Sequence, residues 1–160
     1  MAQVQVIFAL LLSMLPVFEL RGAIPLLAGY SVSFGIPFIP YAIAAIFLNI
    51  LAIFFIFFFL DYLHEKLMAF NFYGNFFKRY LVRAKRRARK IESRFSSIGF
   101  FALFLFVAVP FPGTGAWTGC IVSWLLGLSR KKSIVAISLG VLFAGLVVLF
   151  GSLGVLAFFK

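Results

Sequence analysis

Long apolar stretches dominate the chain, and polar or helix-breaking positions interrupt them at a few places. Four stretches can be read along the sequence: residues 4–32, 40–60, 96–128 and 133–159. The second and fourth are continuous, and as helices they would be about 30 and 40 Å long, enough to cross a hydrocarbon core of about 30 Å. The pattern therefore predicts two transmembrane helices.

The other two stretches are broken by residues that a helix inside a bilayer tolerates poorly. Residues 4–32 are interrupted at 19–25 by Glu-Leu-Arg-Gly-Ala-Ile-Pro, and residues 96–128 are interrupted at 110–115 by Pro-Phe-Pro-Gly-Thr-Gly. Each arm of the latter would give a helix of only about 20 Å, which is too short to span. We therefore predict that both stretches are re-entrant helical hairpins that turn back at mid-membrane.

Composition sets the class of protein and excludes several functions. With 64% hydrophobic and 12% charged residues, the chain is too apolar for a soluble surface, so we expect an all-α integral membrane protein. Its 160 residues leave room for a single membrane domain, 1–160. One Cys, one His and four acidic residues offer no nucleophile–base pair and no metal-ligand cluster. We therefore expect neither an enzyme nor a cofactor or metal site.

The basic residues predict the topology. Most of the Lys and Arg residues lie within 61–95, and a second basic cluster occupies 129–132. The positive-inside rule places both clusters in the cytoplasm. A single crossing by residues 96–128 would put them on opposite sides, whereas a hairpin keeps them on the same side. The uncharged linker 30–40 is typical of an outer loop.

These orientations predict an inverted repeat of two units, each a re-entrant hairpin followed by a transmembrane helix. The first repeat, 1–60, contains hairpin 4–32 and helix 40–60, and the second, 96–160, contains hairpin 96–128 and helix 133–159. The hairpins would then enter the membrane from opposite faces. We expect a multi-pass protein of the plasma membrane. Because two helices and two hairpins make a thin wall around a cavity, we also expect a homodimer.

Residues 61–95 connect the two repeats. Apolar residues recur there every three or four positions, with Lys and Arg between them, which predicts a cytoplasmic amphipathic connector on the inner leaflet. Its basic face should attract anionic lipid head groups. The net charge of +11 would also suit nucleic-acid binding, but the apolar composition argues against that partner.

The two interruptions carry the candidate chemistry. At a re-entrant tip, the returning helix presents unpaired N–H groups at its positive end, which form a seat for an anion. Arg21 can hold a phosphate or a carboxylate, and Glu19 can pair with Arg21 or take up a proton. The alternatives are a ligand-free turn at the second break and a purely structural Glu19–Arg21 ion pair.

Two further residues complete the candidate site. Asn49 lies on a stripe of small residues within 40–60, where it either packs against another helix or lines the site. Trp117 is either an interfacial anchor or a cavity residue, because it is so close to the second break. The predicted substrate-binding residues are Glu19, Arg21, Gly22, Pro25, Asn49, Pro110, Pro112, Gly113, Thr114, Gly115, Trp117 and Thr118.

Two motifs carry a resemblance to a known family. Glu19-Leu-Arg-Gly-Ala-Ile-Pro25 and Pro110-Phe-Pro-Gly-Thr-Gly-Ala-Trp-Thr-Gly119 resemble the family called putative small multidrug export proteins, over nearly the whole chain. That family is similar to the wider DedA-like group of membrane proteins. Paired re-entrant hairpins are expected in that group, and some of its members are implicated in flipping polyisoprenyl-phosphate lipid carriers. The resemblance implies proton- or ion-coupled transport.

From the residues and the resemblance together, we expect a transporter or flippase for an anionic amphiphile such as a polyprenyl-phosphate lipid carrier, coupled to a proton or ion gradient. Two alternatives stay open: an exporter of small molecules or of several drugs, and a membrane scaffold that transports nothing. The expected partners are membrane lipids and an anionic lipid or small-molecule substrate.

Overall fold

The computed structural model of the protein describes residues 2–68, 98–111 and 113–158. These residues form six α-helices and no strand, which confirms the predicted all-helical class for this part of the chain. The helices are α1 (Ala2–Leu12), α2 (Glu19–Phe34), α3 (Phe38–Met68), the helix Ile98–Ala108, α5 (Ala116–Leu125) and α6 (Arg130–Phe158).

Two of these helices are long and apolar enough to cross a membrane: Phe38–Leu63 within α3, and α6. α3 continues to Met68, beyond the predicted end at residue 60, because residues 61–68 contain no Gly or Pro and several strong helix formers. The first part of the expected connector 61–95 is therefore the end of α3. Its remainder, 69–95, lies outside the described residues.

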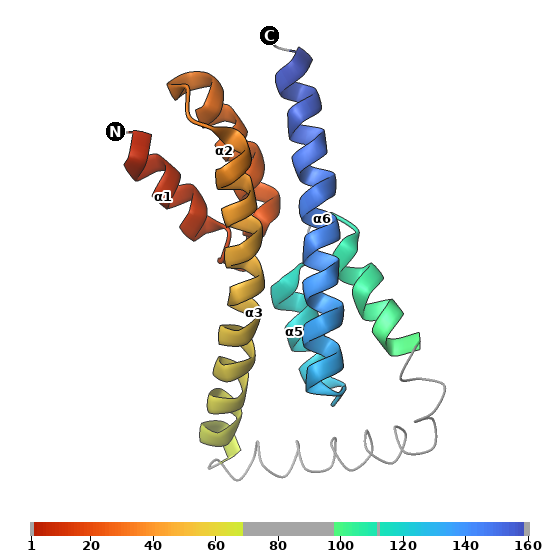
Figure 1. Ribbon diagram of the computed structural model, residues 1–160. Helices are drawn as coiled ribbons and strands as arrows, with labels where there is room; N and C mark the ends of the chain where they lie inside the picture. The colour runs from red at the N-terminus through yellow and green to blue at the C-terminus, as the bar shows by residue number, and fades with distance from the viewer. Residues whose placement is uncertain (1, 69–97, 112, 159–160) are drawn as a thin grey trace.

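The shorter helices come in two pairs. α1 and α2 are joined by residues 13–18, and the helix Ile98–Ala108 is joined to α5 by residues 109–115. In Figure 1 each pair forms a hairpin whose bend lies near mid-height, alongside α3 and α6. The first hairpin opens toward the end of the molecule that carries both termini, and the second opens toward the other end.

The two bends compare differently with the sequence-based prediction. The second coincides with the expected break at 110–115, but the first lies before the predicted interruption at 19–25, which instead forms the opening turns of α2. Pro16 accounts for the shift, because it lacks an N–H and disfavours helical backbone at the preceding residue. Pro25 lies inside α2. A proline there frees one helix carbonyl, which membrane helices tolerate when neighbouring groups compensate.

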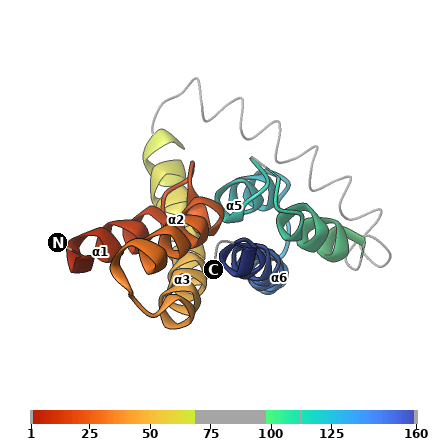
Figure 2. The ribbon, with the colours of Figure 1, turned by 90° about the horizontal axis from the view of Figure 1, so that it is seen from above.

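Small residues let the two halves of the molecule pack closely. Seen from above in Figure 2, α6 lies between the first hairpin and the helix Ile98–Ala108. A Cβ atom on Gly140 of α6 would lie 2.8 Å from Val107, and one on Gly145 would lie 2.7 Å from Ile46 of α3. These contacts leave no room for a side chain, as is typical of helix packing in membranes.

A polar cluster ties α3 to the end of α5 and the start of α6. The Asp61 carboxylate accepts hydrogen bonds from both terminal nitrogens of Arg130, at 2.5 and 2.6 Å, and from Nε1 of Trp124 at 3.1 Å. The Arg130 guanidinium also lies over the Phe57 ring, 4.9 Å from its centroid. Residue 61 and residues 129–132 therefore lie at the same end of the molecule.

Candidate functional site

α2 begins at an acidic residue with unusual backbone geometry. Glu19 has a φ of 47°, in the left-handed region that residues other than glycine rarely adopt, and it is only 5% exposed. Such a conformation costs about 1–3 kcal/mol and persists where the surroundings hold it in place. Here the carboxylate reaches the second hairpin, where Oε1 accepts a hydrogen bond from the backbone N–H of Trp117 at 3.2 Å.

The Glu19 carboxylate lies at the N-terminus of α5. Gly115 is the N-cap residue of that helix, and a Cβ atom on Gly115 would overlap the carboxylate. The N-terminus carries unpaired N–H groups and the positive end of the helix dipole, so it favours an anion. In this structure the side chain of Glu19 occupies the position where the sequence predicted an anionic ligand.

Arg21, in the first turn of α2, reaches the other end of the same break. Its guanidinium donates to four backbone carbonyls and one hydroxyl of the second hairpin. Nη2 donates to the carbonyls of Val107 (3.2 Å), Val109 (3.1 Å) and Thr114 (2.8 Å), and Nη1 donates to the carbonyl of Phe111 and to Oγ1 of Thr114 (3.1 Å). Five acceptors from the second hairpin therefore surround a single cation.

These contacts match each charge to a helix end. The last carbonyls of the helix Ile98–Ala108 lack helical partners and form its negative end. The guanidinium donates to one of them, that of Val107, and to three carbonyls of the loop that follows. The acid of the first hairpin thus caps one helix of the second hairpin, and the base caps the other. Within the described residues, Glu19 and Arg21 form no direct ion pair.

Two threonines fix the second break from within. Thr114 Oγ1 lies 2.8 Å from the carbonyl oxygen of Val109 and 2.9 Å from that of Phe111, so its single hydrogen is donated between these two acceptors. Thr118 Oγ1 donates to the carbonyl of Gly113 (2.7 Å) and accepts from the N–H of Gly115 (3.2 Å). Both hydroxyls therefore hold the loop in the shape that presents its carbonyls to Arg21.

The two breaks line a common pocket of about 260 Å³, which we call the tip cavity. Its lining residues are Pro16, Val17, Phe18, Glu19, Arg21, Gly22, Pro110, Gly113, Gly115 and Thr118. Seven of these were predicted from the sequence: Glu19, Arg21, Gly22, Pro110, Gly113, Gly115 and Thr118. At roughly 30 Å³ per water, the volume is enough for about eight waters or a small polar group.

The remaining predicted residues lie elsewhere. Thr114 contacts Arg21 from the loop, Pro25 lies further along α2, and Pro112 lies outside the described residues. Asn49 of α3 is 1% exposed, and its Nδ2 donates to the carbonyl of Ser13 at 2.5 Å. Its Oδ1 has no hydrogen-bond partner among the described residues. Asn49 therefore braces the first break and does not line the tip cavity.

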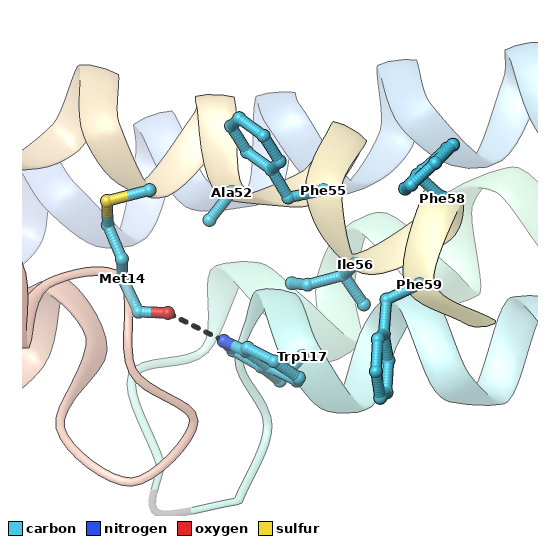
Figure 3. Close-up of a pocket in the computed structure, with 7 residues that line it drawn as sticks. All are labelled: Met14, Ala52, Phe55, Ile56, Phe58, Phe59 and Trp117. Carbon is cyan, nitrogen blue, oxygen red and sulfur yellow. Dashed lines mark hydrogen bonds between the residues drawn. The ribbon is translucent and has the colours of Figure 1, made fainter. Parts of the chain in front are cut away.

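The side chain of Trp117 also braces the first break. Its indole Nε1 donates to the carbonyl of Met14 at 2.8 Å, and the ring lies against α3 beside Ile56 and Phe59 (Figure 3). Side chains from α3 and α5 thus satisfy two consecutive carbonyls of the first break, as Arg21 does for the second. The sequence alone did not identify Ser13 and Met14, although Pro16 was a usable signal for a break beside them.

The site's chemistry comes from its charges and its helix ends. It places a carboxylate and a guanidinium beside a cavity at the junction of two hairpins. Among the described residues no group of His, Cys, Asp and Glu could hold a metal ion. Residues 19–147 match the family model described as putative small multi-drug export protein. No curated protein and no solved structure matches the chain.

Proposed function

Because this chain belongs to the family described as putative small multi-drug export protein, we propose that it is a membrane transporter that exports small molecules through the tip cavity. The family and the two apolar helices indicate a membrane protein. The observation that supports a transport site is the tip cavity itself, where an acid and a base of one hairpin cap the helix ends of the other.

The transport step follows from the contacts of Glu19. While ionised, its carboxylate is held by the N-terminus of α5, and it helps to join the two bends. Protonation would remove the charge that the helix dipole attracts and weaken that contact. The titratable groups that interact with Glu19 in the described residues are Arg21 on α2 and Cys120 on α5. We propose that proton uptake at Glu19 releases the bends and opens the tip cavity.

The membrane topology is part of this proposal. Two hairpins that enter from opposite faces, each followed by a full-length helix, would form an inverted repeat with the tip cavity near the bilayer midplane. The opposite openings of the hairpins in Figure 1 support this arrangement. Asp61 and Arg130 would then lie at the cytoplasmic end, beside the basic segments.

The proposal also covers the class of substrate, which is either an anionic amphiphile or a small molecule. An anionic amphiphile such as a polyprenyl phosphate would require the Arg21 guanidinium to exchange its carbonyl partners for the head group. In this structure those partners are engaged. We therefore favour small-molecule export, as the family description suggests, over a lipid flippase.

Reconstitution in liposomes tests the proposal. Flux of fluorescent aromatic compounds and of a fluorescent polyprenyl phosphate is measured under an imposed pH gradient, for the intact chain and for Glu19→Gln. We expect gradient-driven flux of the aromatic compounds in the intact chain and its loss in Glu19→Gln. Glu65→Gln, which removes the same charge near the end of α3, is the matched control and should retain flux.

Three other results would change the conclusion. Flux of the polyprenyl phosphate alone would favour the flippase. Flux that is equal in the intact chain and Glu19→Gln would remove Glu19 from the transport step. Absence of flux for every compound, with a folded protein, would favour a scaffold.

A further inference from the structure

A second cavity adjoins the two bends, through Met14 of the first hairpin and Trp117 of the second. It has a volume of about 370 Å³ and an almost entirely apolar lining, which comprises Met14, Trp117 and the α3 residues Ala52, Phe55, Ile56, Phe58 and Phe59. We call it the apolar groove. Its volume falls within the range of small-molecule sites, about 300–1,000 Å³.

The chemistry of the lining selects the kind of molecule that would fit. In Figure 3, Ile56 and Phe59 point from α3 toward the indole of Trp117. Aromatic rings favour other rings in stacked or edge-on contact, and the thioether of Met14 adapts to irregular shapes. The indole N–H is already bonded to the carbonyl of Met14, so the groove offers little hydrogen bonding to a ligand. Uncharged aromatic molecules match these surfaces best.

Trp117 connects the groove to the tip cavity. Its indole Nε1 holds the carbonyl of Met14, and its backbone N–H holds the carboxylate of Glu19. Met14 and Trp117 are also near neighbours in sequence of Pro16, Gly115 and Thr118, which line the tip cavity. A molecule that moves the indole would therefore act directly on the segment that positions Glu19.

We propose that the apolar groove binds the aromatic part of an uncharged lipophilic substrate, and that Trp117 transmits its binding to Glu19. This inference rests on the proposed export function, since it names the class of substrate and the place where it first binds. Substrate would enter the groove from the lipid, because Phe58 and Phe59 are exposed on the outside of α3.

Equilibrium binding tests the groove independently of transport. The protein has two tryptophans, so Trp124→Phe leaves Trp117 as the sole tryptophan donor of energy transfer. The probe is the uncharged aromatic dye N-phenyl-1-naphthylamine, added to the full chain in nanodiscs without a pH gradient. We expect saturable energy transfer, and about tenfold weaker binding in Phe59→Ala, which removes a ring contact and its buried area.

The control is matched in residue type, helix and exposure. Phe54 of α3 is 53% exposed, Phe59 is 52% exposed, and only Phe59 lines the groove. Phe54→Ala should bind the dye like the parent protein. Equal affinity in the two variants, or energy transfer that rises with lipid content and never saturates, would overturn the proposal. Ala52→Leu, which fills the groove, provides a second test if Phe59→Ala does not fold, and should also weaken binding.

The role of Trp117 has its own readout. Trp117→Phe keeps an aromatic ring in the groove but removes the donor to Met14. We expect this variant still to bind the dye, as measured by direct dye fluorescence, but to lose gradient-driven flux. Retained flux would show that Trp117 does not couple the two sites. Groove-dependent binding in a protein without flux for any compound would instead contradict the proposed export function and leave the groove assignment intact.

Discussion

The contact between Glu19 and Gly115 requires a residue without a side chain. Gly115→Ala would place a methyl group where the carboxylate lies. We expect the variant to be destabilised by about 1–3 kcal/mol, as for other overpacked sites, in unfolding measured in detergent. Gly29→Ala in α2 is the control, because a Cβ atom there meets nothing within 4 Å. It should be neutral or stabilising by up to about 1 kcal/mol. Equal losses in both variants would argue against the contact.

Arg21 acts through the shape of its guanidinium as well as through its charge. Lysine keeps the charge but cannot reach the same set of acceptors, which would leave several carbonyls of the second break unpaired. We expect Arg21→Lys to lower stability by about 1–3 kcal/mol in the same unfolding assay. Arg83→Lys in the connector is the matched exchange and should have little effect. A stable Arg21→Lys protein would mean that charge alone suffices.

At the scale of elements, the position of the second break could be predicted from the sequence more accurately than that of the first. The second break combines Pro110 with two nearby glycines, and Gly113 has a φ of 87°, so composition and backbone geometry agree. The first break contains Pro16 among apolar neighbours, whereas the more conspicuous residues, Glu19 and Pro25, come three and nine positions later. Glu19 and Arg21 were read as an interruption of the apolar stretch. In the structure both lie in α2, and both side chains contact the second hairpin.

The choice of Glu19 and Arg21 as site residues was accessible from the sequence, since charge is rare in so apolar a stretch. Their partners were not, because the contacts join residues about ninety positions apart and depend on how two hairpins meet. The Asp61–Arg130 pair was missed for the same reason. The sequence did contain a signal for this pair. Asp61 and Arg130 have opposite charges and each follows an apolar stretch, and the charge pattern placed both residues on the same side of the membrane.

The Asp61–Arg130 pair links α3 to α6, and its strength can be measured. Both side chains are 44% exposed, so the pair should be worth no more than about 1 kcal/mol. A double-mutant cycle with Asp61→Asn and Arg130→Gln, followed by unfolding in detergent, should give a favourable coupling energy of that size. Strictly additive effects of the two substitutions would show that the pair does not link the helices.

At the scale of the whole molecule, the orientation of the two hairpins can be tested by labelling. In a Cys120→Ala background, Ser33→Cys near the end of α2 and Ser129→Cys before α6 each provide one exposed thiol. A membrane-impermeant maleimide should label residue 33 from outside intact cells and residue 129 only in inverted vesicles. Labelling of both residues from the same side would contradict the inverted repeat.

The outer surface of the molecule is consistent with a lipid environment. Large apolar side chains are exposed on α1, α3 and α6, among them Phe8, Phe58 and Phe150. Such a surface would be an aggregation hazard in water, but it is ordinary in a bilayer. It also leaves apolar faces available for a second copy, so the homodimer stays a prediction that crosslinking in native membranes can test.

The central claim is that Glu19 and Arg21 join the two bends by capping the helix ends of the second hairpin. Amide hydrogen exchange over residues 105–120, followed by mass spectrometry in nanodiscs, tests it most directly. Exchange in this segment should become faster in Glu19→Ala and in Arg21→Ala, and should stay at the parent rate in Glu65→Ala. Parent-like exchange in all three variants would show that the bends hold their structure without these two side chains.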